Sequence, residues 1–109
     1  MSVRGTPGAD DLQALLAVDR VIHEPVRLAI LSILAGADSV EFKFLEGTLG
    51  LSKGNLSSHA TKLEEAGYIE VNKTFRGKTP VTTYRLTAAG RQALDSYWSA
   101  VRGAAPTSP

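Results

Sequence analysis

Apolar residues recur at helical spacing along the first two thirds of the chain. Leu12, Leu15 and Leu16 form one apolar stripe, which predicts a first helix near residues 10–18. Residues 25–36 are apolar nearly all round, begin with a proline and end with a glycine. We therefore expect a second helix here at the centre of the core, because a helix without a polar face needs neighbours on every side.

Two shorter helices are predicted after a brief extended segment at residues 40–42. The first ends at Gly50, and the second, residues 52–66, begins at Ser52, a residue type that caps helix N-termini. Their apolar positions at helical spacing are Phe42, Leu45 and Leu49 in the first helix and Leu56, Ala60 and Leu63 in the second. Because glycine permits a tight left-handed connection, residues 50–52 are expected to form the turn of a helix-turn-helix.

The period of the pattern changes to two after these helices. Ile69 and Val71 alternate with polar neighbours, and the alternation resumes at Tyr84 and Leu86. This pattern predicts a β-hairpin with a basic tip at residues 76–80.

A last helix is predicted from Ala88 to about Arg102, with Thr87 as its cap. The expected fold class is therefore α+β, mainly α. It consists of a three-helix core and a β-hairpin, flanked by an N-terminal and a C-terminal helix.

A chain of 109 residues has the size of one domain. Residues 10–102 are expected to form it, and the small and helix-breaking residues at 1–9 and 103–109 predict flexible tails. The absence of cysteine excludes disulfides, thiolate metal sites and cysteine nucleophiles. No stretch is apolar enough for a membrane span, so we expect a cytoplasmic protein that does not associate with membranes.

The formal net charge of +1 conceals an uneven distribution. Residues 1–50 carry four basic and seven acidic side chains, whereas residues 51–86 carry six basic and three acidic ones. A basic segment joined to an acidic one is typical of a protein that binds a polyanion on one surface. The separation is weak evidence alone, because differences of this size also arise by chance.

The helix at residues 52–66 carries short polar side chains outside its apolar face. A helix that enters the DNA major groove needs small side chains to approach closely, and amides or hydroxyls to contact base edges and phosphates. Asn55 and Ser58 are the leading candidates for reading bases, since Asn can bond adenine in bidentate fashion. The candidate DNA contacts on this helix are Ser52, Lys53, Asn55, Ser57, Ser58, His59 and Lys62. An ordinary solvated helix face is the alternative interpretation.

The predicted hairpin places Arg76 and Lys78 on either side of Gly77. Basic side chains at such a tip suit the DNA backbone or the minor groove, where phosphate contacts add affinity without sequence information. The candidate DNA contacts of the hairpin are Lys73, Arg76, Lys78 and Thr79. A charged turn that protects a sheet edge is the alternative interpretation.

The sequence contains no recognisable catalytic constellation. We find no nucleophile beside a base, no acid pair and no phosphate-binding loop, so we do not expect an enzyme. His23 and His59 are the only histidines, and without cysteines they do not complete a tetrahedral metal site. We expect no metal and no cofactor, and we expect His59 to hydrogen-bond near a phosphate or the neighbouring helix.

Several segments together resemble the winged helix-turn-helix transcriptional regulators related to the MarR and ArsR types. Residues 47–59 and 62–71 resemble the helix-turn-helix and the start of the wing, and residues 76–91 resemble the wing and its junction with the last helix. Residues 23–31 resemble the first core helix, so the resemblance spans about residues 20–95.

The resemblance implies a prokaryotic regulator that binds double-stranded DNA in a sequence-specific manner. We expect a repressor, with an activator as the alternative. Residues 52–66 would form the recognition helix in the major groove, and residues 72–83 the wing on the backbone or in the minor groove. Metal sensing is not implied, because the metal-binding relatives use clusters of cysteine, histidine and acidic residues and this chain has no cysteine. A small-molecule effector would have to bind between subunits.

The resemblance also implies a homodimer. A symmetric dimer needs a near-palindromic operator whose half-sites lie about one helical turn, or a multiple, apart. The expected dimer contacts lie on the apolar faces of the first and last helices: Leu12, Leu15, Leu16, Leu94, Tyr97, Trp98 and Val101. Packing of the first helix on the last within one chain is the alternative use of these faces.

A winged helix that serves as a protein–protein interaction module, without direct DNA binding, is the main alternative function. Such a module is expected to carry exposed Leu, Phe or Trp on the second helix of the helix-turn-helix. That helix carries Lys, Asn, Ser and Thr instead, which favours DNA binding.

Overall fold

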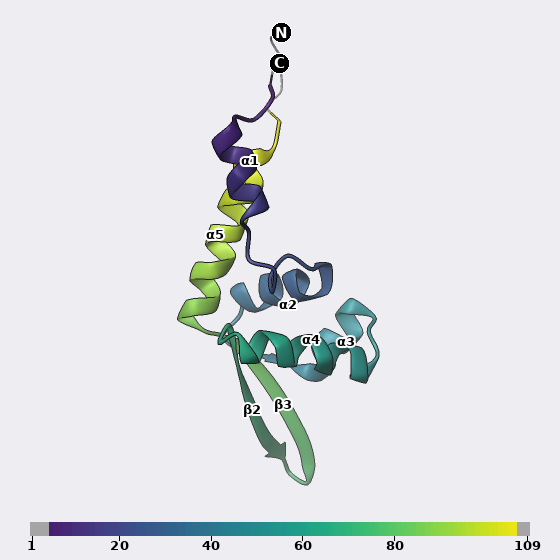
Figure 1. Ribbon diagram of the computed structural model, residues 1–109. Helices are drawn as coiled ribbons and strands as arrows, with labels where there is room; N and C mark the ends of the chain where they lie inside the picture. Colours follow the sequence, from purple (N-terminus) through teal and green to yellow (C-terminus); the bar gives the residue numbers. More distant parts are fainter. Residues whose placement is uncertain (1–4, 107–109) are drawn as a thin grey trace.

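The computed structural model describes residues 5–106, which form five helices and a three-stranded antiparallel sheet (Figure 1). In chain order the elements are α1 (Ala9–Leu16), α2 (Pro25–Ala35), β1 (Val40–Glu41), α3 (Phe42–Leu49), α4 (Lys53–Glu65), β2 (Ile69–Arg76), β3 (Thr79–Leu86) and α5 (Ala88–Ala104). The α+β, mainly helical fold predicted from the sequence is confirmed.

Several boundaries differ from the expectation, beginning with α1, which was predicted near residues 10–18 and runs from Ala9 to Leu16. Phe42 begins α3 and is not extended, and both strands of the hairpin continue up to the two-residue turn at Gly77 and Lys78. Helix α5 includes Gly103 and Ala104, which were predicted to belong to a flexible tail. Residues 1–4 and 107–109 of the predicted tails lie outside the described residues.

Local hydrogen bonds fix where the helices begin. The Glu24 carboxylate accepts from the backbone N–H of Arg27 at 2.8 Å and caps α2, whose first residue is Pro25. The Ser52 hydroxyl accepts from the N–H of Asn55 at 3.1 Å and caps α4. Gly50 ends α3 with φ of 65°, a left-handed conformation that favours glycine, so the predicted turn of the helix-turn-helix is confirmed.

The core is apolar and lies where α2, α3, α4, α5 and the base of the sheet meet. Its fully buried side chains are Ile22, Ile30, Leu31, Leu34, Leu45, Leu56 and Leu63. Each such side chain stabilises the fold by about 1.5–3 kcal/mol relative to an exposed one. No polar or charged side chain is buried among the described residues, so the interior of the core is held by apolar packing.

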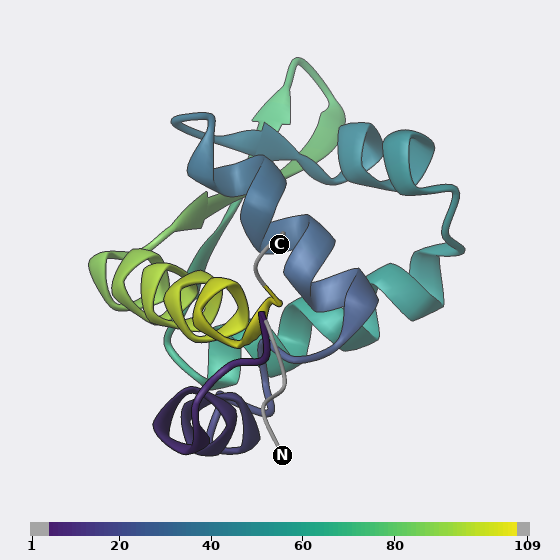
Figure 2. The ribbon, with the colours of Figure 1, turned by 90° about the horizontal axis from the view of Figure 1, so that it is seen from above.

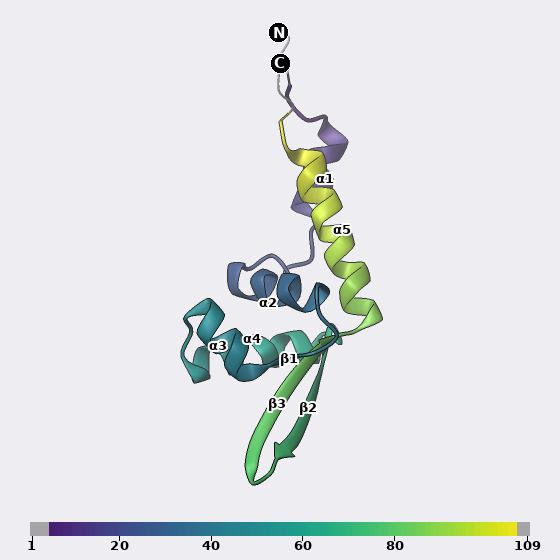
Figure 3. The same ribbon diagram turned by 180° about the vertical axis from the view of Figure 1, so that it is seen from behind.

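The sheet has the strand order β1-β3-β2. Strand β1 pairs only with Tyr84 and Thr83 of β3, whereas β2 and β3 pair along their whole length, from Ile69↔Leu86 to Arg76↔Thr79. The outer part of this hairpin therefore has no third strand and projects freely from the core (Figures 1 and 3). Pro80 is tolerated in β3 because β1 does not reach its outer edge.

The molecule is elongated, with extents of 67 × 25 × 22 Å and a Cα radius of gyration of 17.0 Å. Helices α1 and α5 lie side by side at one end, the hairpin forms the other end, and α2, α3 and α4 lie between them (Figures 1 and 3). Seen along the long axis, α2 lies over α4, and α1 lies beside α5 on the outside of the molecule (Figure 2). No helix among residues 5–106 is long and apolar enough to cross a membrane.

Candidate nucleic-acid interface

Helix α4 is attached to the core by one face and presents the other to solvent. Leu56, Ala60 and Leu63 are all buried, at the spacing the sequence predicted. The side chains left exposed are those of Lys53, Asn55, Ser57, Ser58, Thr61 and Lys62, together with Glu64 and Glu65 at the C-terminal end of the helix. The predicted contacts Lys53, Asn55, Ser57, Ser58 and Lys62 thus share one surface, and Ser52 lies at its N-terminal end as the helix cap.

His59, which was predicted to be a DNA contact, faces the protein. Its side chain is 20% exposed, and its Nδ1 lies 3.2 Å from the guanidinium of Arg27 and 3.5 Å from the carboxylate of Glu24. Arg27 belongs to α2 and Glu24 caps that helix, so both partners of the His59 ring lie on the neighbouring helix. The prediction that His59 bonds the neighbouring helix is confirmed, and we remove this residue from the DNA-contact set.

Arg27 fastens α4 to the segment that precedes α2. Besides His59, its side chain donates to the backbone oxygen of Val21 at 2.5 Å and to that of Arg20 at 3.3 Å. Burial alone would raise the pKa of the Glu24 carboxyl, but backbone N–H groups and the nearby His59 and Arg27 lower it below the usual value. Neither Arg27 nor Glu24 can be identified from the sequence as a support of α4, because the contact joins residues more than thirty positions apart.

A groove of about 400 Å³ separates α4 from the hairpin. Lys53, Ser57 and Thr61 line it from α4, and Lys73 and Thr82 line it from the strands. Two ammonium groups and three hydroxyls are the donors that a phosphate backbone requires. Glu64 also lines the groove, at the end near the C-terminus of α4.

The tip of the hairpin carries the remaining predicted contacts. Lys78 and Thr79 are exposed, and Gly77 adopts φ of 65° in the two-residue turn. Arg76 is 74% exposed and forms an ion pair with the Glu41 carboxylate of β1. An acidic partner for Arg76 was not foreseen, since only the β1–β3 register brings Glu41 beside the hairpin.

Phe75 is a further exposed residue of the hairpin and was not among the predicted contacts. This side chain is 70% exposed although it lies in a strand, next to the basic tip. The register pairs Phe75 with Pro80, which puts two apolar residues on the same side of the hairpin as Lys73 and Thr82. The strict alternation of β2 is the signal that could have identified it.

The apolar faces of α1 and α5 are only partly available to a partner. Leu94 and Tyr97, predicted as dimer contacts, are 4% and 6% exposed and belong to the core of the chain itself. We withdraw them from the dimer surface, because side chains already buried have little area left to offer. Leu12 and Leu16 of α1 are 41% and 73% exposed, and Leu15, Trp98 and Val101 are half-buried.

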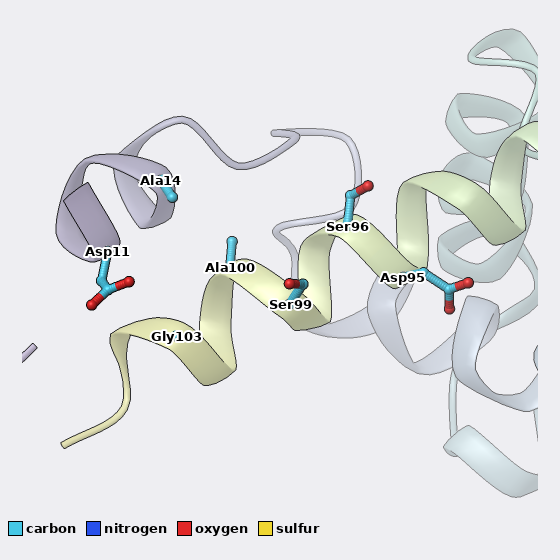
Figure 4. A pocket seen from close by; sticks show the side chains of 7 residues that line it. All are labelled: Asp11, Ala14, Asp95, Ser96, Ser99, Ala100 and Gly103. Atoms are coloured by element: carbon cyan, nitrogen blue, oxygen red, sulfur yellow. The ribbon is translucent and has the colours of Figure 1, made fainter. Parts of the chain in front are cut away.

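Helices α1 and α5 pack on each other within one chain, which was the alternative use of these faces. The small residues that face the hollow between them, Ala14, Ser96, Ser99, Ala100 and Gly103, allow the two helices to lie close (Figure 4). The Asp11 and Asp95 carboxylates lie at its rim (Figure 4). The intramolecular contact occupies part of the predicted dimer surface and leaves Leu16 free.

Two polar contacts hold the segment between α1 and α2. The Tyr68 hydroxyl donates to the Asp19 carboxylate, and this bond, together with burial and the charge of Asp19, raises the pKa of Tyr68 to about 12. His23 Nδ1 lies 3.0 Å from the Tyr97 hydroxyl of α5. Among residues 5–106 there is no group of three or more His, Cys, Asp or Glu side chains that could hold a metal ion.

Comparison with known families agrees with this geometry. The family model described as "Winged helix DNA-binding domain" matches residues 26–104, which include every element from α2 to α5. An uncharacterised protein of Methanocaldococcus jannaschii is 36% identical over 78 residues, an alignment that covers 72% of this chain and 85% of the relative.

Several solved structures of transcriptional regulators have a similar fold. A transcriptional regulator homologue from Pyrococcus horikoshii superposes with a TM-score of 0.77 at 26% identity, covering 85% of this chain and 91% of that one. The transcriptional repressor BigR from Xylella fastidiosa superposes with a TM-score of 0.58 at 26% identity, covering 84% and 83%. A MarR-family regulator from Silicibacter pomeroyi has a TM-score of 0.60 at 19% identity, covering 86% and 62%, which shows the fold alone.

Proposed function

Because the chain belongs to the family of winged helix DNA-binding domains, we propose that it is a repressor that binds a specific double-stranded DNA sequence. The observation that carries the proposal is the shared polar surface of α4 and the hairpin. This surface offers amide, hydroxyl and ammonium groups and is backed by a fully apolar face. The repressor role rests on the likeness to a protein named as a repressor, and a protein bound at a promoter blocks polymerase without further machinery.

Helix α4 is the element that would enter the major groove. Apart from Lys53, its exposed side chains near the N-terminus are short, so the backbone can approach the base edges closely. Asn55 and Ser58 lie on the exposed surface, where an amide can bond adenine in bidentate fashion and a hydroxyl can bond any base. Lys53 and Lys62 would contact the flanking phosphates.

The hairpin would lie beside α4 as the wing. The phosphate backbone would occupy the groove between them, where Lys53 and Lys73 face each other from the two elements. Lys78 at the tip would extend the contact toward the minor groove. These contacts give affinity and orientation, whereas α4 gives the sequence preference.

Two copies would bind a near-palindromic site. The exposed apolar residues of α1, above all Leu16, would contact the second copy, since a monomer gains nothing from leaving them in water. The two copies of α4 would then read half-sites about one helical turn, or a multiple, apart.

The competing function, a protein-interaction module without DNA binding, has less support. The large apolar side chains exposed among residues 5–106 are Leu12, Leu16, Phe44 and Phe75, and none of them lies on α4. A recognition helix used for a protein partner would be expected to present such residues.

The test is fluorescence anisotropy of the full chain with a random pool of duplexes of about 30 base pairs, followed by selection of the bound sequences. We expect one selected site bound with a steep salt dependence, and a loss of about five- to a hundredfold for Asn55→Ala at that site. Gln92→Ala, which removes an exposed amide from α5, is the matched control and should bind normally. Absence of binding even at low salt would contradict the proposal.

A further inference from the structure

Phe75 is an apolar side chain in an unusual place. It is 70% exposed, lies at the free end of the hairpin and is followed directly by Arg76 and the Gly77–Lys78 turn. Its cross-strand partner Pro80 is also exposed. The two form an apolar pair within a segment that is otherwise basic or polar.

The register shows which way the pair points. Residues two positions apart in a strand share a face, so Phe75 lies on the face of Lys73 and Val71, and Pro80 on that of Thr82 and Tyr84. Val71, Lys73, Thr82 and Tyr84 all line the groove toward α4. Phe75 and Pro80 therefore continue the α4-facing side of the hairpin beyond the groove, toward the tip.

We propose that Phe75, supported by Pro80, is an apolar wedge that packs into the DNA minor groove beside the site read by α4. The proposal rests on the proposed function and adds a second mode of reading to it. Lys73 on the same face and Lys78 at the turn would hold the phosphates on either side, so that the ring meets sugars and base edges. Apolar side chains placed in this way partly unstack a base step, and flexible pyrimidine–purine steps cost least to deform.

The positive charge around the ring indicates DNA as the occupant. Lys73, Arg76 and Lys78 flank Phe75 within three positions, and Glu41 is the acidic partner at Arg76. Docking of two hairpin tips against each other would bring these basic groups together, and like charges repel across an interface.

The experiment compares Phe75→Ala with the wild type on the duplex that the wild type selects from the random pool. We expect binding about tenfold weaker, the low end of the range for an aromatic ring stacked on a base. We expect the slope of log K against log salt to stay unchanged, because no phosphate contact is lost. Lys78→Ala should instead reduce that slope by about 1, and Phe75→Leu should recover part of the affinity.

A second readout separates a wedge from a merely structural role. Replacing a TA step by an A-tract in the flank of the selected duplex should weaken the wild type and leave Phe75→Ala unaffected. Phe44→Ala is the matched control, since Phe44 is 54% exposed on α3. This variant should bind each of the two duplexes as tightly as the wild type does.

Three outcomes would overturn the proposal. Unchanged affinity of Phe75→Ala would show that the ring touches no DNA. Loss of self-association in the free Phe75→Ala protein, measured by sedimentation equilibrium, would assign the ring to a second copy. Failure of the wild type to bind any duplex would contradict the proposed function itself, and the wedge with it.

Discussion

Tyr68 couples the stability of the fold to alkaline pH. Its hydroxyl donates to Asp19, which raises its pKa from the ordinary value of 10.0 to about 12. Between these values the unfolded chain has lost the phenol proton and the native state retains it. The native state then binds more protons, so the free energy of unfolding falls as pH rises.

We therefore expect Tyr68→Phe to be less stable than the wild type near neutral pH. Its free energy of unfolding should also fall less steeply at alkaline pH. Urea unfolding of both proteins at pH values from about 8 to 12 measures the difference. Burial and Glu64 also raise the pKa of Tyr84, so some decline should remain in the variant. Parallel curves for the two proteins would contradict the role of the Tyr68–Asp19 bond.

Gly90 is required by a close approach of two backbones. A Cβ at this position of α5 would overlap the carbonyl oxygen of Tyr68 and lie 2.8 Å from Cδ1 of Leu86. Because that carbonyl also accepts from the N–H of Thr87 at 3.0 Å, it cannot move without breaking the junction of β3 and α5.

Gly90→Ala should lower the free energy of unfolding by about 1–3 kcal/mol, the usual range for overpacking, and lower the Tm accordingly. Gly47→Ala on α3 is the control, since its Cβ would meet no atom within 4 Å. That variant should gain about 0.5–1 kcal/mol from the higher helix propensity of alanine. A harmless Gly90→Ala would show that α5 can shift away from the β2–α4 junction.

At this scale the sequence predicts what depends on neighbours along the chain. The caps at Ser52 and Thr87, and the exposure of Asn55 and Ser58, follow from local pattern. The burial of His59, Leu94 and Tyr97 does not follow from local pattern. The sequence does not show whether an apolar residue faces the core or a partner. His59 faces the protein because its ring bonds Arg27, which is distant in sequence.

Strand β1 limits the charge of the wing. Although it has only two residues, it brings Glu41 against Arg76, so one of the basic groups near the tip is neutralised in the free protein. Both side chains are exposed, and ion pairs of this kind contribute about 0–1 kcal/mol to stability.

We expect Glu41→Gln to bind duplex DNA several-fold more tightly at low salt, with little change in Tm, because Arg76 is released and a negative charge is removed from beside the hairpin. Glu70→Gln is the matched control. It makes the same change in net charge at the base of the hairpin, where Glu70 pairs with Arg85. Equal gains in affinity for the two variants, measured by anisotropy, would mean that only net charge matters.

The elements themselves were predictable because helix and strand periods are local properties. Every expected helix is present, and the hairpin has the expected alternation. The length of the wing was not, since Pro80 indicates a loop when it is considered alone. Only the pairing of Phe75 with Pro80 shows that the strands continue past it to a two-residue turn.

For the whole molecule, the exposed apolar face of α1 is the surface through which two copies would form a dimer. Leu16 is 73% exposed and Leu12 is 41% exposed, whereas their neighbours on α5 are largely covered. If a second copy packs here, Leu12→Glu with Leu16→Glu should separate the copies, because four carboxylates would meet at a symmetric interface.

Sedimentation equilibrium should then give the mass of one 11.6 kDa chain for this variant and about twice that mass for the wild type. The Tm should change little at protein concentrations where the wild type is also a single chain. Phe44→Glu, an equal change on α3, should leave the wild-type mass unaltered. A single-chain mass for the wild type at all concentrations would contradict the dimer.

The elongated shape determines how such masses must be measured. A radius of gyration of 17.0 Å exceeds the value of about 13 Å expected for a compact chain of this length. One copy alone therefore experiences more friction and diffuses more slowly than a sphere of equal mass. It will leave a gel-filtration column early, at the position of a compact protein considerably heavier than itself. An apparent dimer from elution volume is what a single copy would give, whereas equilibrium sedimentation and light scattering respond to mass and are independent of this friction.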